Sequence, residues 1–177
     1  MKTTTFLMLT LLASIMACTE EESFKKTLPV QIDAHAMHHH RNYSTHLNGD
    51  QERPNPVDTR GQGQAHFKLN KAGTSLHYKL IVANIENVTQ AHLHLIADEI
   101  NQTGGIVVWL YPSAPPAQLI PGRSNGPLAE GEITDANLVG ALAGMTLADL
   151  IDAINEGKIY ANVHTTQNPP GEIRGDL

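Results

Sequence analysis

Most of the chain alternates hydrophobic and polar positions with the two-residue period of a β-strand. Residues 64–70 place Phe67 and Leu69 on one face, with His66 and Lys68 on the other. Residues 75–84 repeat the alternation after a glycine-containing turn, so the two segments predict a β-hairpin. Similar alternation, or a short continuous apolar run, predicts further strands at 43–49, 88–96, 106–111, 130–133, 158–164 and 171–177.

One segment near the C-terminal end has the period of an amphipathic helix instead. Its apolar residues follow the spacing i, i+3, i+4, i+7, at Leu147, Leu150, Ile151 and Ile154. Thr146 with Asp149 three positions later is typical of a helix N-cap, and Gly157 is typical of a helix C-terminus. These signals predict one short helix near residues 146–156.

Short strands at regular intervals, separated by turn signals, are typical of an all-β domain. Two stretches rich in proline and glycine, 51–63 and 112–127, predict long loops between strands. The sequence thus predicts a mainly β fold, either a β-sandwich or a Greek-key barrel. With 177 residues, of which 41% are hydrophobic, the chain is long enough to build one sizeable core.

The first 17 residues have the features of a secretory signal peptide. Lys2 supplies a positive charge, and residues 6–16 form an apolar run that is short for a membrane span. The run ends in Ile15-Met16-Ala17-Cys18, which resembles a bacterial lipobox. The resemblance implies cleavage before Cys18 and lipidation of its thiol. The alternative is an ordinary signal peptide followed by a chance cysteine.

Lipid on Cys18 implies that the membrane is a partner, because several acyl chains on one residue suffice for stable anchoring. We therefore expect a lipid-anchored protein of the bacterial cell envelope, facing the periplasm or the cell exterior. Residues 18–42 have the composition of a flexible tether. They include four histidines and a methionine within 35–40, a tract that suits a polar linker but can also bind copper, nickel or zinc.

The charge balance and the single cysteine exclude several classes of protein. There are 12 lysine and arginine residues against 18 aspartates and glutamates, a net charge of −6, so nucleic acid is not an expected partner. One cysteine allows neither an intramolecular disulfide nor a cysteine-rich zinc module. The 10 histidines are numerous for a chain of this length and direct attention to metal binding.

Several segments of the predicted β domain resemble the CHRD domain, a module named after chordin. These are LNGDQERPNPVDTRGQGQAHFKL from Leu47, VTQAHLHL from Val88, GIVVWL from Gly105, and YANVHT from Tyr160 followed by PGEIRG from Pro170. The resemblance covers about residues 45–177, and we place the domain at 43–177. It implies an immunoglobulin-like β-sandwich or barrel with a distant likeness to copper/zinc superoxide dismutase. It implies no particular biochemical activity. The chain departs from the family pattern at residues 95–97, where the family often has a glycine.

Strand parity brings several polar side chains of these motifs to one side of the sheet. His92 and His94 are two residues apart and both lie opposite the apolar Leu93. In the segment 158–164 the apolar residues take the alternate positions, which leaves Asn162 and His164 on the other face. We expect all of the following to point outward: His92, His94, Asn162, His164, Glu172 and Arg174.

Two interpretations of these outward side chains stay open. If the strands lie close together, His92, His94 and His164 form a site for copper or zinc with one open coordination position. The His-x-His step resembles the copper-binding step of the superoxide dismutases. Alternatively, the polar side chains form a structural network, in which Glu172 and Arg174 pair and hold the last strand.

The sequence favours a non-catalytic, membrane-anchored interaction module whose partner is an unknown protein or surface ligand. The loops 51–63 and 112–127 are its expected contact surface. The alternative function is copper or zinc binding through His92, His94 and His164. No pair of carboxylates and no serine in a nucleophile context indicates an enzyme, so no catalytic residue is assigned.

Overall fold

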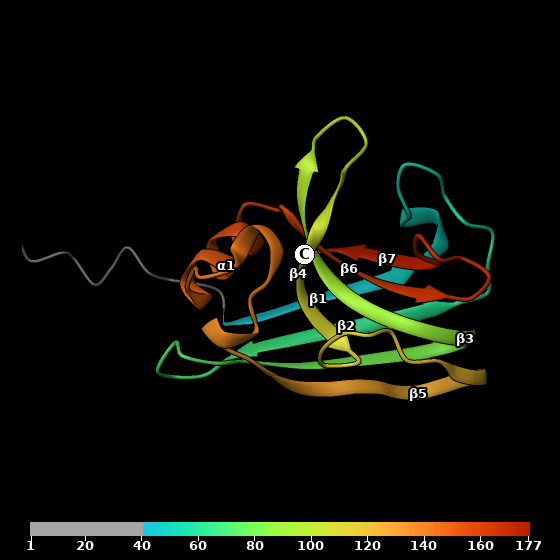
Figure 1. The fold of residues 1–177 in the computed structure, drawn as a ribbon, viewed down its shortest axis with the longest axis horizontal. Coiled ribbons are helices and arrows are strands. Elements are labelled where there is room, and N and C mark those ends of the chain that lie inside the picture. The colour runs from blue at the N-terminus through green and yellow to red at the C-terminus, as the bar shows by residue number, and fades with distance from the viewer. Residues whose placement is uncertain (1–40) are drawn as a thin grey trace, which may run out of the picture. The chain divides into compact units, whose positions relative to one another are not determined.

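Seven antiparallel strands and one α-helix make up the part of the chain that the structure, a computed structural model, describes: residues 41–177 (Figure 1). The strands are β1 (Asn42–Asn48), β2 (Gln62–Leu69), β3 (Leu76–Asp98), β4 (Thr103–Tyr111), β5 (Ile120–Ile133), β6 (Ile159–Thr165) and β7 (Ile173–Asp176). The helix is α1 (Leu147–Asn155), and short 3-10 turns occur at η2 (Gly49–Gln51), η3 (Asp135–Asn137) and η4 (Gly140–Leu142). The predictions for the signal peptide, for Cys18 and for most of the tether fall on residues 1–40, outside the described residues. Within residues 41–177, no helix is both long and apolar enough to cross a membrane.

The long strand β3 organises the sheet. Its first half pairs with β2 along one edge and with β5 along the other, and its second half pairs with β6 and β4 in the same way. β1 joins β2 to β7, and β7 pairs with β6, so the pairings close a ring of β1, β2, β3, β6 and β7. The fold is therefore a small β-barrel with β4 and β5 attached to β3 outside the ring. The predicted mainly β fold with one short helix is confirmed.

Two of the predicted strands, 75–84 and 88–96, are halves of the single strand β3. The strand passes through the intervening residues with register shifts against β5. Asn84 and Asn87 adopt φ angles of 55° and 54° there, a left-handed conformation that asparagine tolerates better than most residues. The chain therefore changes direction without leaving the sheet.

The predicted loop at 112–127 is wrong in its second part, because β5 begins at Ile120. Pro121 and Pro127 lie within this strand and remove backbone donors, which favoured the loop prediction. In the described chain β5 pairs with β3 alone, so it is an edge strand with one unpaired side. Prolines are tolerated in edge strands, where a missing donor breaks no ladder.

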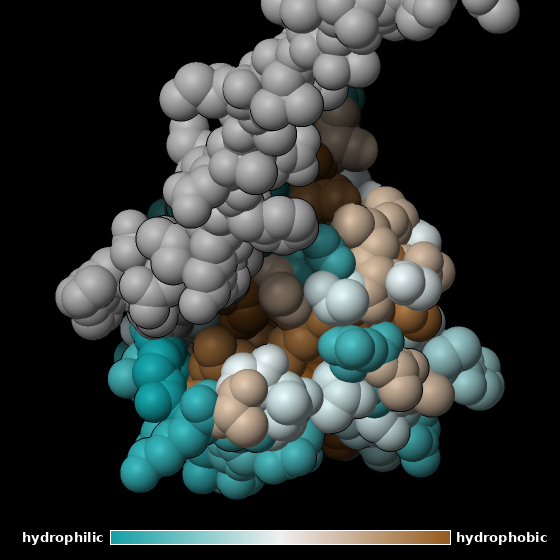
Figure 2. All heavy atoms as spheres, turned by 90° about the vertical axis from the view of Figure 1, so that its left-hand side faces the viewer, coloured by the Kyte–Doolittle hydropathy of each residue, from teal (hydrophilic) through white to brown (hydrophobic). Residues whose placement is uncertain are grey.

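Mainly aliphatic side chains fill the barrel interior. β2 alternates exposed and buried residues along its whole length, as predicted. The helix α1 lies at one end of the barrel (Figure 1), and the four apolar residues that predicted it belong to the same buried cluster as the strands. Figure 2 looks onto this side of the molecule, where hydrophobic side chains gather in the centre and hydrophilic ones along the lower rim.

The N-terminus of α1 carries the predicted cap. Asp149 Oδ2 accepts hydrogen bonds from the Thr146 backbone N–H at 2.8 Å and from the Thr146 hydroxyl at 2.7 Å. The Thr146 hydroxyl oxygen in turn accepts from the Asp149 N–H at 3.4 Å, which completes a capping box. At the other end Gly157 has a φ of 68°, the left-handed conformation expected after a helix.

We expect Thr146→Ala to lower the free energy of unfolding by about 1 kcal/mol, because it removes the hydroxyl that accepts from the Asp149 N–H and donates to the Asp149 carboxylate. Urea denaturation of the full chain measures this change. Ser113→Ala, in the exposed loop before β5, is the control and should change the free energy by less than about 0.5 kcal/mol. Equal losses in the two variants would contradict the capping role.

Candidate metal centre

β6 is buried on both of its faces, and this overturns the expectation that its polar side chains point to solvent. Every residue from Ile159 to Thr165 is buried. The alternate apolar residues belong to the hydrophobic core. Tyr160, Asn162 and His164 lie on the opposite face and are 5%, 2% and 5% exposed. The parity argument grouped these side chains correctly, but the face that they share is covered by other parts of the chain.

Two loops help to cover this polar face. Thr59 fixes the loop after β1, because its hydroxyl donates a hydrogen bond to Glu172 Oε1 at 2.7 Å. Arg174 fixes the loop between β3 and β4, because its Nη1 donates a hydrogen bond to the backbone carbonyl of Gln102. Both Glu172 and Arg174 are consequently buried, with 7% and 1% of their area exposed. Their expected outward direction is correct, and their expected contact with solvent is wrong.

Strand register arranges the polar side chains in rows across β3, β6 and β7. His92 lies opposite Asn162, which lies opposite Arg174, and His94 lies opposite Tyr160. His164 is two residues beyond Asn162 on β6 and so falls on the same face. The structure thereby brings three histidines from two neighbouring strands together.

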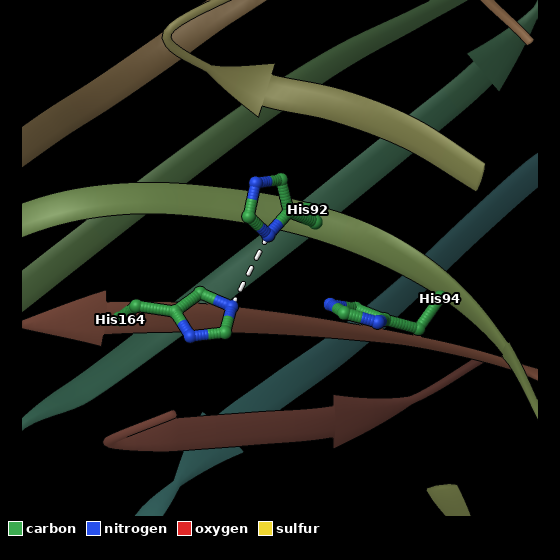
Figure 3. Close-up of side chains that lie close together, drawn as sticks. All are labelled: His92, His94 and His164. Atoms are coloured by element: carbon green, nitrogen blue, oxygen red, sulfur yellow. Dashed lines mark hydrogen bonds between the residues drawn. The ribbon is translucent and has the colours of Figure 1, made fainter. Parts of the chain in front are cut away.

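The three imidazoles surround a common space (Figure 3). One ring nitrogen from each of His92, His94 and His164 lies within 4.8 Å of the other two. The side chains are 0%, 7% and 5% exposed, respectively. Two metal–nitrogen bonds of about 2.1 Å span at most about 4.2 Å, so the most distant rings need to draw together by at least about 0.6 Å to hold one ion.

Backbone carbonyls hold the outer nitrogen of two of these rings. The Nδ1 atom of His94 lies 3.0 Å from the Gly104 oxygen, and that of His164 lies 2.8 Å from the Pro169 oxygen. A carbonyl only accepts, so both neutral rings carry their proton on Nδ1 and keep a lone pair on Nε2. His164 Nε2 then accepts from His92 Nδ1 at 3.1 Å. The Nε2 atoms of His92 and His94 are buried and make no hydrogen bond.

Aromatic side chains pack around the histidines. The single tryptophan, Trp109, meets the His92 ring edge-on, with centroids 4.3 Å apart and an interplanar angle of 85°. Tyr160 stacks on His94 at 4.8 Å and 6°. The guanidinium of Arg174 lies 3.6 Å from the centroid of the Tyr160 ring. These contacts hold the imidazoles in place, and they put a cation close to the cluster.

Burial keeps the histidine cluster uncharged. Loss of hydration, together with repulsion from His164 and His94, lowers the pKa of His92 from 6.5 to about 3. Burial likewise lowers the pKa of His94 to about 4, against the opposing effect of its hydrogen bond to Gly104. The pKa of His164 is also lowered by burial. All three rings are therefore neutral at neutral pH, the state in which imidazole binds metal ions.

Glu172 and Arg174 have partners other than the ion pair suggested by the sequence. The Glu172 carboxylate accepts hydrogen bonds of 2.7, 2.6 and 3.1 Å from Thr59, Thr165 and Asn168. Arg174 Nε donates to Asp176 Oδ1 at 2.8 Å. The reason is that the covering loop and the β6–β7 turn supply donors that strand parity alone does not reveal. A structural polar network therefore lies beside the histidine cluster.

The sequence analysis missed Glu52, which is only 4% exposed and approaches Asn162 beside Gly171. It falls in the predicted loop 51–63, where no periodicity indicates burial. Trp109 was assigned to a strand but not to the site. Its place in the site becomes evident only from the strand pairing, in which it lies opposite His92. The other described histidines are exposed and stand apart from the cluster: His46, His66 and His77.

We expect the metal-free protein to lose stability as the pH falls from about 7 towards 4. Unfolded histidine takes up a proton near 6.5, whereas folded His92 and His94 do so only near 3 and 4, so the unfolded chain binds more protons in this range. Glu52 acts in the opposite direction, because burial raises its pKa from 4.5 to about 7 and the folded chain holds its proton. Because two histidines oppose this single carboxyl group, lowering the pH should reduce the free energy of unfolding on balance.

Urea midpoints near pH 7, 6 and 5, measured in a metal chelator, test this expectation. The dependence on pH should be shallower in His92→Leu, which removes one of the groups responsible. A midpoint that stays constant between pH 7 and 5 in the unaltered protein would contradict it.

Comparison with known proteins adds one result to this geometry. A family model for the CHRD domain matches residues 43–177, a range that includes the helix and all three clustered histidines. Neither a search of the curated proteins nor a search of the solved structures found a significant match. Because the family model covers most of the sequence, this chain belongs to the CHRD domain family.

Proposed function

We propose that this CHRD-domain protein binds a copper or zinc ion at the histidine cluster. The observation that carries the proposal is the Nε2 atom of His94, which is buried, holds a lone pair and makes no hydrogen bond. Leaving a buried acceptor without a partner costs free energy, and a metal ion in the cluster would remove that cost. Neutral imidazoles are ligands that suit copper and zinc.

The hydrogen bonds around the cluster support a defined ligand set. His94 and His164 would bind through Nε2, because the carbonyls of Gly104 and Pro169 hold their Nδ1 protons. His92 would bind through Nδ1, and the proton that it now shares with His164 would move to its Nε2. Carbonyl partners of this kind orient metal-binding histidines. Three protein ligands leave one coordination position open for water or another ligand.

We propose further that the role is binding without catalysis, and that it is carried out in the bacterial cell envelope. Cleavage before Cys18 and lipidation of its thiol would anchor the chain, with residues 18–42 as the tether. A site built from histidines alone suits an oxidising compartment, where a cysteine ligand is open to oxidation. Residues 113–119, which are exposed before β5, would be the contact surface for an envelope partner, either a protein or a surface ligand.

Titration of the metal-free full chain with Cu²⁺ or Zn²⁺, in a non-ionic detergent, tests metal binding. All samples carry asparagine in place of His35, His38, His39 and His40, so that the tether tract takes no part. We expect one ion per chain. We also expect Cu²⁺ to quench Trp109 fluorescence, because the indole is the only one in the chain and its centroid lies 4.3 Å from that of His92.

His94→Ala and His164→Ala should each weaken metal binding by at least about tenfold. His66→Ala, on the exposed face of β2, is the matched control and should leave the affinity unchanged. Failure of the unaltered protein to take up metal, or equal affinity with and without His94, would contradict the proposal. Either result would favour an interaction module in which the histidines are a structural network.

Metabolic labelling with an alkyne fatty acid tests the anchor. The unaltered chain should carry the label, and Cys18→Ser should not, because Cys18 is the only thiol in the chain. Thr19→Ser, the neighbouring substitution, should be labelled normally. Labelling of Cys18→Ser, or the lack of label on the unaltered chain, would count against a lipoprotein.

A further inference from the structure

We propose that Glu52 is the counter-charge of this metal site and acts on it through Asn162, so that the site favours a divalent over a monovalent ion. This inference rests on the proposed metal binding and assigns to that site a residue outside the ligand set. Such a residue is a positioning and charge-balancing group, because it touches a neighbour of the ligands and not the ion.

Glu52 and Asn162 meet over the β6–β7 turn. An ideal Cβ built on Gly171 lies 2.5 Å from Glu52 Oε1 and 2.7 Å from Asn162 Nδ2. Both side chains therefore occupy a space that exists only because residue 171 has no side chain. The Glu52 backbone is held as well, since its N–H donates to the Gly49 carbonyl at 3.1 Å and closes η2.

Asn162 connects Glu52 to the histidines. It lies opposite His92 in the ladder between β3 and β6. Its amide group favours the charged form of Glu52, because it lowers the pKa of that carboxyl group. Both Asn162 Oδ1 and Glu52 Oε1 are buried without a hydrogen-bond partner, so each retains capacity to respond to a new charge.

The charges in this region leave Glu52 as the group able to balance an ion. Three neutral imidazoles supply no negative charge, and Arg174 adds a positive one near Tyr160. Asp176 is half-exposed and already pairs with Arg174. The Glu172 carboxylate is held in place by hydrogen bonds from Thr59, Thr165 and Asn168.

An uncompensated ion in a buried region is unfavourable, and the attraction to a carboxylate grows with the charge of the ion. Buried Arg174 and Tyr160 and the exposed Arg53 also lie near Glu52, and the two arginines favour its ionised form. Glu52 should therefore contribute more to the binding of Zn²⁺ than to the binding of Cu⁺.

The test measures the Zn²⁺ and Cu⁺ affinities of Glu52→Gln in the detergent-solubilised full chain lacking the tether histidines. Glutamine keeps the shape of the side chain and removes its charge. We expect the Kd for Zn²⁺ to rise by about tenfold and the Kd for Cu⁺ by less than about threefold. Glu132→Gln, at an exposed position of β5, is the matched control and should change neither value.

A double-mutant cycle with Asn162→Ser tests the route. If Glu52 acts through Asn162, Glu52→Gln should add less than about a twofold effect on Zn²⁺ binding in the Asn162→Ser background. A full tenfold effect in that background overturns the assigned route. If Glu52 only supported the fold, its substitution would not weaken Zn²⁺ binding more than Cu⁺ binding, and this effect would not depend on Asn162.

The remaining outcomes separate this inference from the proposed function. Tight Zn²⁺ binding by the unaltered protein, with Glu52→Gln within about twofold of it, overturns the inference and leaves metal binding intact. Equal weakening of Zn²⁺ and Cu⁺ also overturns it, since that result indicates a purely structural role. Absence of metal binding in the unaltered protein overturns both.

If Glu52→Gln fails to fold, proton release by the unaltered protein replaces the variant. Calorimetry of Zn²⁺ binding near pH 7 in two buffers of different ionisation enthalpy measures that release. We expect a net release of protons when Zn²⁺ binds, because burial raises the pKa of Glu52 to about 7 and the ion favours the ionised carboxylate. No release would overturn the inference.

Discussion

A strand that is buried on both faces cannot leave its polar side to water, and this constraint shapes one whole side of the domain. In β6 the apolar positions enter the core, while Asn162 and His164 must find partners among protein atoms. The covering segments supply many of them. Thr59 reaches Glu172 from the loop after β1, and the Pro169 carbonyl reaches His164 from the β6–β7 turn. The loops are therefore part of the hydrogen-bonded interior of the domain.

Much of the barrel could be predicted because its determinants are local. The alternation in β2 and the Thr146 cap of α1 depend on neighbours within a few residues, and the structure contains both. The predictions failed where a distant segment decides the outcome. Residues 120–127 form a strand because β3 accepts them at its edge, although their prolines and glycines favour a loop.

The same distinction applies to the candidate site. Parity along two strands was enough to place His92, His94 and His164 on one face, since alternation is a property of each strand alone. Their burial depends on loops that are distant in the sequence. Strand alternation does not reveal these loops, so the polar side chains were expected to be exposed. Glu52 shows most clearly what the sequence does not reveal. Its carboxylate is buried, with only 4% of the residue exposed, yet nothing in its irregular segment indicates this.

The carbonyls that hold His94 and His164 also bear on how fast an ion could enter or leave. Both belong to chain reversals, one at the start of β4 after the β3–β4 loop and one in the β6–β7 turn. With ligands no more than 7% exposed, side-chain rotation alone does not open a path, and these backbone segments must move. Exchange at the cluster is then limited by local opening of the barrel rim, so its rate follows the stability of two turns. A site with this design would hold an ion kinetically, whatever its equilibrium affinity.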